Sequence, residues 1–134
     1  MTRGVTAFLM PLLDKPSVVD TDFCAICGRP AIDRHHVIQK GMGGYSKKTE
    51  KRIPMMRLCG FGNNSGCHGL MHKGRLHIYW DEGMGGWVFW VSPEPMKDFD
   101  AWYFHSDEYL PVPGWYEQQT GKLLHVFGSG KVGR

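Results

Sequence analysis

The sequence predicts an α+β protein with a small metal-bearing N-terminal part and a β-hairpin-rich C-terminal portion. Three observations lead to this prediction. Four cysteines fall in two spaced pairs, and two histidine pairs lie beside them, one before β-branched residues and one at helical spacing. Two runs of aromatic and β-branched residues flank a glycine-rich turn. With 134 residues, the chain has the length of one ordinary domain, so we expect residues 1–134 to form a single domain.

The elements of the first half are expected to be short. Residues 1–22 contain prolines and no helical period, which indicates an extended arm. The Cys-x-x-Cys run at 24–29 indicates a zinc knuckle closed by Gly28, which can adopt a positive φ. The rest of this half is expected to contain a short strand at 33–39 and a basic loop at 45–52. A second strand at 55–58 and a short helix at about 67–73 are expected to follow.

The second half has a different character. Residues 76–80 and 87–91 are rich in β-formers and should pair as a hairpin across 81–86. A second hairpin could pair 114–117 with 123–127, and one helical turn is expected near 97–104. We therefore expect residues 76–134 to form a β-rich extension packed on the metal-bearing part.

The four cysteines are the only ones in the chain. Cys24 and Cys27 are separated by two residues, and Cys59 and Cys67 by seven residues rich in Gly and Asn. Because no secretion signal precedes them, zinc thiolates in a reducing cytoplasm are a better interpretation than disulfides. A structural zinc held by all four is therefore expected, with one or more free buried cysteines as the alternative. Four thiolates leave no open position for catalysis.

The histidines can supply a second kind of site. His68 and His72 are four residues apart and share one face of a helix, and His35 on a strand could add a third ligand to a divalent ion. His36 would then point to the other face of the strand, where a neutral imidazole could deprotonate water. For any one histidine, a packed or solvent-facing side chain is the simpler interpretation. His77, His105 and His125 fall outside the pattern.

These motifs together resemble a known family. His35-His36-Val37-Ile38, a glycine-rich turn, Leu58-Cys59 and then Cys67-His68-Gly69-Leu70-Met71-His72 resemble the HNH endonucleases of phage, prophage and restriction systems that carry a four-cysteine zinc. The resemblance covers residues 24 to about 73 and implies a ββα-metal core with zinc knuckles there. It implies that His36 is the general base and that His35, His68 and, as a further ligand, His72 bind a catalytic divalent ion (Mg²⁺, Mn²⁺, Ni²⁺ or Zn²⁺).

One family position is not matched. The family's middle asparagine precedes the Leu-Cys pair, but residues 52–57 contain no asparagine. Asn63 or Asn64, a backbone carbonyl or another side chain could brace the base-bearing loop instead.

Charge is distributed unevenly. Residues 29–75 carry ten Lys/Arg and two acids, a balance of +8, whereas residues 76–134 carry four Lys/Arg and eight acids, a balance of −4. A polyanion should therefore meet the histidine and cysteine motifs, although a solvated basic loop is the plainer interpretation of the charge alone. The candidate phosphate contacts are Lys40, Lys47, Lys48, Lys51, Arg52, Arg57, Lys73 and Arg75.

The expected function is metal-dependent hydrolysis of double-stranded DNA, by nicking or with weak specificity. Strong specificity would need a protein partner, a second copy of the chain or the aromatic C-terminal half, whose rings could stack bases but more often form a core or an oligomer surface. The alternatives are a non-catalytic zinc module that binds nucleic acid or protein, and an RNA endonuclease. No apolar run approaches the ~20 residues needed to cross a membrane, so a cytoplasmic protein is expected.

Overall fold

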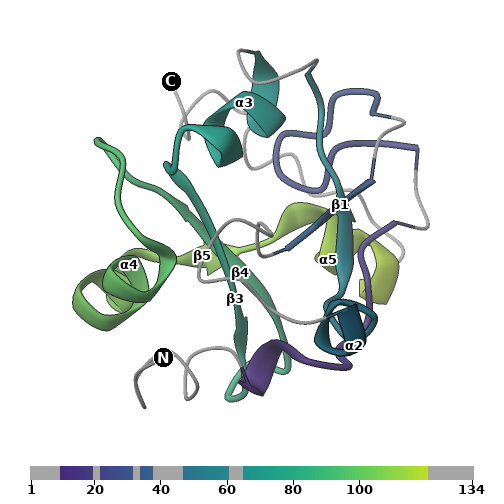
Figure 1. Cartoon of the computed structure of the whole chain (residues 1–134). Helices are drawn as coiled ribbons and strands as arrows, with labels where there is room; N and C mark the ends of the chain where they lie inside the picture. The colour runs from purple at the N-terminus through teal and green to yellow at the C-terminus, as the bar shows by residue number, and fades with distance from the viewer. Residues whose placement is uncertain (1–9, 20–21, 32–33, 38–46, 61–64, 121–134) are drawn as a thin grey trace.

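The structure is a computed structural model that describes residues 10–19, 22–31, 34–37, 47–60 and 65–120 (Figure 1). These residues form a mixed α+β arrangement with small antiparallel sheets, which confirms the predicted class. The helical elements are η1 (Met10–Leu12), α2 (Lys47–Glu50), α3 (Gly66–His72), α4 (Asp98–His105), η2 (Ser106–Glu108) and α5 (Pro113–Thr120). The strands are β1 (Arg34–His36), β2 (Met55–Arg57), β3 (Leu76–Asp81), β4 (Gly86–Val91) and β5 (Leu110–Pro111).

The first sheet pairs β1 with β2 in antiparallel register, with His35 opposite Met56 and His36 opposite Met55. The other side of β2 is occupied by the N-terminal segment. The amide of Val18 donates to the carbonyl of Met55 (2.8 Å), and the amide of Arg57 donates to the carbonyl of Val18 (3.1 Å). The central residue, Met56, is fully buried as a result.

The second sheet has the order β3-β4-β5. β3 and β4 pair from Leu76 opposite Val91 to Asp81 opposite Gly86, over the two runs that the sequence analysis paired. Figure 1 shows this long hairpin passing through the middle of the molecule, with α4 on one side and α5 on the other. Aromatic rings pack on both faces: Tyr79 stacks on Trp102 of α4 at 4.0 Å between ring centroids, and Trp80 lies edge-on to Trp115 of α5 at 5.4 Å. These aromatic side chains are therefore core residues.

One hydrophobic cluster includes residues from both halves of the chain, from Leu12 to Trp115. Two long-range hydrogen bonds connect the same parts. The indole Nε1 of Trp87 donates to the carbonyl of Pro16 (2.8 Å), and the amide of Gly114 donates to the carbonyl of Ala25 (2.8 Å). The cysteine-bearing segments and the hairpin thus share one core.

Three local expectations differ from the structure. Residues 114–117, expected as a strand, lie in α5; Pro113 at its first position has the fixed φ and missing N–H that a helix start tolerates. Its expected partner at 123–127 lies outside the described residues. The loop at 45–52 contains the short helix α2, and the arm contains the η1 turn. The helical turn expected near 97–104 is α4.

No helix among the described residues has the length and apolar character needed to span a membrane.

The buried indole of Trp87 gives a test of this core. Trp87 is 0% exposed, so Trp87→Ala should lower the free energy of unfolding by about 3–5 kcal/mol. Tyr103→Ala, at a ring that is 67% exposed, should change it by less than about 1 kcal/mol. Urea denaturation followed by circular dichroism measures both; equal losses in the two variants would contradict the described packing.

Candidate functional site

The sulfur atoms of four cysteines lie close together: two come from the turn at residues 24–28, one follows β2 and one lies at the start of α3. The Sγ atoms of Cys24, Cys27, Cys59 and Cys67 all lie within 4.8 Å of one another, and those of Cys27 and Cys59 are 3.4 Å apart. A tetrahedral zinc with Zn–S bonds of about 2.3 Å places its sulfur ligands about 3.8 Å apart. The four sulfur atoms therefore have the identity and spacing that a structural metal such as zinc requires.

The first cysteine pair is positioned by a tight turn. The amide of Cys24 donates to the carbonyl of Arg29 (2.7 Å), and the amide of Gly28 donates back to the carbonyl of Cys24 (3.1 Å). Gly28 has a φ of +82°, as its place in the turn predicted. The amide of Ile26 also donates to the Sγ atom of Cys24 (3.4 Å).

The second pair is positioned by the end of β2 and the start of α3. The amide of Cys67 donates to the Sγ atom of Cys59 (3.4 Å), and the amide of His68 donates to the Cys59 carbonyl (2.9 Å). Gly66 allows this approach, because it has a φ of +65° and a Cβ atom there would lie 2.6 Å from the same carbonyl. The backbone thus brings Cys59 and Cys67 together despite their separation in the sequence.

Mutual hydrogen bonds distribute the protons of the four thiols unequally. The hydrogen bond with Cys24 lowers the pKa of Cys27 to about 7 and moves the pKa of Cys59 far below its ordinary range. The hydrogen bond with Cys27 raises the pKa of the Cys24 thiol, and the hydrogen bond with Cys24 raises the pKa of the Cys67 thiol. Because thiolates are the ligand form, a dication entering the cluster would displace the remaining protons.

The strand and helix histidines also come together. The ring of His35 on β1 stacks on the ring of His68 on α3, with centroids 3.9 Å apart and an interplanar angle of 26°. The ring of His72 meets that of His68 edge-on at 4.4 Å. The Nε2 atom of His35 and the Nδ1 atom of His68 are both buried, whereas His72 is an exposed residue.

His36 lies beside this cluster on the same strand. Residues that follow one another on a strand point to opposite faces, and its cross-strand partner is the half-buried Met55 rather than the buried Met56. His36 is half-buried. The two neighbouring histidines are therefore separated, one into the ring cluster and one onto the other face of β1.

Within the part of the chain that the structure describes, the four cysteines are the one group of three or more Cys, His, Asp or Glu side chains close enough to hold a metal ion. The rings of His35, His68 and His72 are in contact, but these three side chains do not form such a group. Binding of a catalytic ion by His35, His68 and His72 accordingly stays a prediction.

The basic residues named from the sequence have different surroundings. Lys48, Lys51 and Lys73 are exposed, and the exposed guanidinium of Arg52 pairs with Asp14 (Nη2–Oδ2 2.6 Å). The half-buried arginines bind backbone carbonyls: Nε of Arg57 donates to Val19 (3.0 Å) and Nε of Arg75 donates to Ser92 (2.8 Å). Lys40 and the side chain of Lys47 lie outside the described residues, as do Asn63 and Asn64.

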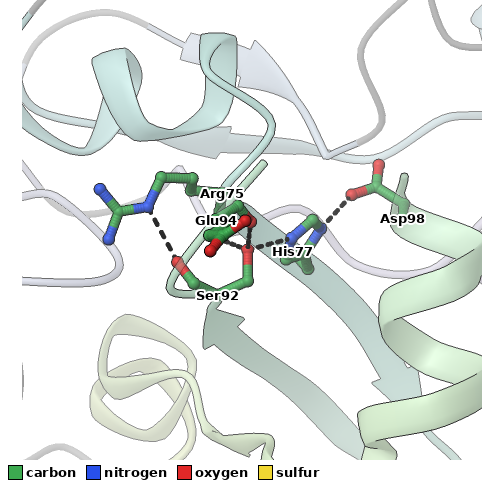
Figure 2. Close-up of polar contacts among 5 residues, drawn as sticks. All are labelled: Arg75, His77, Ser92, Glu94 and Asp98. Carbon is green, nitrogen blue, oxygen red and sulfur yellow. Dashed lines mark hydrogen bonds and ion pairs between the residues drawn. The ribbon is translucent and has the colours of Figure 1, made fainter. Parts of the chain in front are cut away.

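Sequence reasoning did not single out one buried polar network, shown in Figure 2. His77 of β3 is 0% exposed, with Nδ1 2.7 Å from Oδ1 of Asp98 and Nε2 3.0 Å from Oγ of Ser92. The signal was available in part, because a histidine inside a strand with buried neighbours on both sides needs a polar partner. Its partners lie 15 and 21 residues away, so their identity was not predictable from local pattern.

No protein-family model matches the chain, and no curated protein or solved structure matches it significantly.

The cysteine cluster predicts the metal content. The purified protein should contain about one zinc per chain, and Cys24→Ser should lose it and unfold at a lower temperature, because three thiolates and a hydroxyl hold zinc poorly. Asp22→Ser, at an exposed residue of the same segment, should keep both properties. Elemental analysis and thermal denaturation measure them. A folded Cys24→Ser protein with unchanged stability and no zinc would remove the structural metal.

Proposed function

We propose that the protein is a metal-dependent HNH endonuclease that hydrolyses DNA phosphodiester bonds by nicking or with weak specificity. The observation that carries the proposal is the contact between the rings of His35 and His68, at 3.9 Å, directly beside a four-cysteine cluster. One ring comes from a strand and the other from a helix, and His68 follows the ligand Cys67 in the chain. A purely structural zinc module would not require imidazoles gathered at this place.

The proposed core consists of β1, β2 and α3, taken together as a ββα-metal unit with one zinc knuckle before it and one within it. In this assignment the cysteines stabilise the unit and do not take part in the reaction. His35 and His68 would hold a divalent ion, with His72 as a further ligand. Such an ion supplies Lewis-acid stabilisation of the negative charge on the phosphate.

His36 is the proposed general base. It accepts a proton from a water molecule, whose oxygen attacks the phosphorus, and the bond from phosphorus to the leaving sugar oxygen breaks. The leaving oxygen takes up a proton from the solvent, so the products are a phosphate monoester and a sugar hydroxyl. Because His36 and His35 alternate on β1, the base and the ion-binding imidazole are held by one rigid strand while facing different directions.

Substrate affinity is assigned to the positive segment. The exposed lysines Lys48, Lys51 and Lys73 belong to residues 29–75, whose charge balance is +8 from ten Lys/Arg and two acids. Contacts from lysine to phosphate give affinity without reading sequence. A nuclease that nicks with weak specificity is the activity that such a surface supports.

A second candidate is a non-catalytic zinc module that binds nucleic acid or protein. The observation that favours it is that, among the described residues, only the four cysteines meet the geometric condition for a metal site. In that case the histidine rings serve packing. An RNA endonuclease would use the same residues, so plasmid and structured RNA should be compared under one metal condition.

The base assignment predicts the result of one substitution. His36→Ala should reduce nicking of supercoiled plasmid by about 10²–10⁴-fold, because a positioned general base contributes that much. Its zinc content should be unchanged. His105→Ala, at a histidine paired with Glu108, should cut normally. Assays with Mg²⁺, Mn²⁺, Ni²⁺ and EDTA identify the ion, and near-normal cleavage by His36→Ala would exclude this mechanism.

The lysine assignment predicts a change in salt dependence. Lys48→Ala/Lys51→Ala should weaken binding of a DNA duplex and reduce the slope of log K against log salt concentration by about two, since about 0.9 counterions are released per phosphate contact. Lys15→Ala, at a lysine paired with Glu82, is the matched control. Fluorescence anisotropy at several salt concentrations measures the slopes, and identical slopes would place DNA on another surface.

A further inference from the structure

A pocket lies between the metal-bearing half and the hairpin half. Its volume is about 120 Å³, and its lining includes Val37, Met71, Leu76, Met96, Lys97 and Asp98. Four of these six side chains are apolar, and Asp98 supplies a carboxylate. None of these residues has a role in the catalysis proposed above.

The pocket adjoins the histidine cluster. Val37 follows His35 by two residues, directly after the end of β1, so the two residues are at most about 7 Å apart along the chain. Met71 follows His68 by three residues on α3, where Cβ atoms are about 5–6 Å apart. One nucleotide also spans about this distance from phosphate to base. A phosphate at the histidine rings would therefore place its own base, or the next one, at the pocket.

The carboxylate of Asp98 is held in a fixed orientation. Its Oδ1 lies 2.7 Å from Nδ1 of His77, and Nε2 of His77 lies 3.0 Å from the hydroxyl of Ser92. That hydroxyl in turn lies 2.6 Å from the carbonyl of Glu94, to which it can donate. His77 and Ser92 are each 0% exposed, which allows little rotation of either side chain.

Serine, histidine and aspartate in this order are also the residues of a hydrolytic triad, but the serine here cannot meet a substrate because it is completely buried. What the network does present to the exterior is Asp98, whose side chain is 17% exposed and lines the pocket. Figure 2 shows its second oxygen directed away from His77. An oriented acceptor in a mostly apolar wall matches a ligand that is flat, apolar on its faces and carries an N–H donor at its edge.

We propose that this pocket receives one nucleobase of the substrate strand and prefers cytosine. This inference rests on the proposed nuclease function and adds a base preference to it. The exocyclic amino group of cytosine donates to a carboxylate, whereas thymine and uracil present a carbonyl oxygen at the same position and would be repelled. The base is taken out of the stack, which costs least in single-stranded or distorted DNA.

Size and lining agree with a pyrimidine. At about 10–15 Å³ for each water-sized occupant, a volume of about 120 Å³ is large enough for the heavy atoms of a pyrimidine with its exocyclic groups. The thioethers of Met71 and Met96 are suited to lie against an aromatic ring, because polarisable sulfur contacts such rings favourably.

The test measures binding of free nucleosides to zinc-loaded protein with ¹³C-labelled methionine methyl groups. Deoxycytidine should shift the methyl signals of Met71 and Met96 and bind about tenfold more tightly than thymidine, the discrimination expected of one good hydrogen-bonded base contact. No shift of either methyl at the solubility limit of deoxycytidine, or equal binding of the two nucleosides, would overturn the proposal.

Two pairs of variants separate the pocket from the fold. Asp98→Asn should abolish the preference for deoxycytidine, because its amide can donate to the thymine carbonyl, while Asp100→Asn, at an acid of the same helix that does not line the pocket, should retain it. Met96→Trp should fill the pocket and prevent binding, while Met84→Trp, at a partly buried methionine of the β3–β4 turn, should not. Identical behaviour within either pair would count against the pocket.

The result is independent of cleavage, because a nucleoside contains no phosphodiester bond. Protein that binds deoxycytidine but cuts neither DNA nor RNA would retain the pocket and remove the nuclease. Protein that nicks plasmid but shows no methionine shift would retain the nuclease and remove the base pocket.

Discussion

The meeting of four cysteine sulfur atoms at one place is the constraint on which the cysteine-bearing half of the molecule depends. β1 and β2 contain three residues each, and a sheet of that size has little stability by itself. Zinc binding to small four-ligand sites contributes an apparent free energy of about 10–16 kcal/mol, comparable with the whole stability of about 5–15 kcal/mol of an ordinary domain. A metal in the cysteine cluster would therefore be the largest single contribution to holding β2 and α3 at their observed separation.

That constraint is transmitted directly to the histidines. Cys67 and His68 are consecutive, and the amides of both residues bond to Cys59, one to its sulfur and one to its carbonyl. The pairing of β1 with β2 positions His35 beside His68, because His35 lies opposite Met56 on β2. One metal would use all four thiols, whereas the imidazoles beside them would keep nitrogen atoms suited to a second task. Stability and proposed chemistry are thus divided between sulfur and nitrogen ligands a few residues apart.

Local features of this arrangement were predictable and non-local ones were not. Cys24-x-x-Cys27 closed by Gly28 and the helix carrying His68 and His72 depend on spacing over a few residues, and both are found. Arg57 and Arg75 were predicted as candidate phosphate contacts, and the carbonyls that they bind could not be foreseen, because those carbonyls lie 38 and 17 residues away. Residues 114–117 were assigned to a strand from only four side chains, too few to distinguish a period of two from a helix begun by Pro113.

The N-terminal segment along β2 has a further consequence for solubility. A strand edge with unused amides and carbonyls is a template for another chain, and proteins suppress this by covering it. Here Val18 occupies the edge of β2, and Pro16, which lacks an amide hydrogen, precedes it while its carbonyl accepts the bond from Trp87. Proteolysis that removed the chain up to Val19 would expose the backbone of β2 beside the apolar Met56 and favour strand addition between molecules. The segment around Val18 thus covers a strand edge as well as contributing to the core.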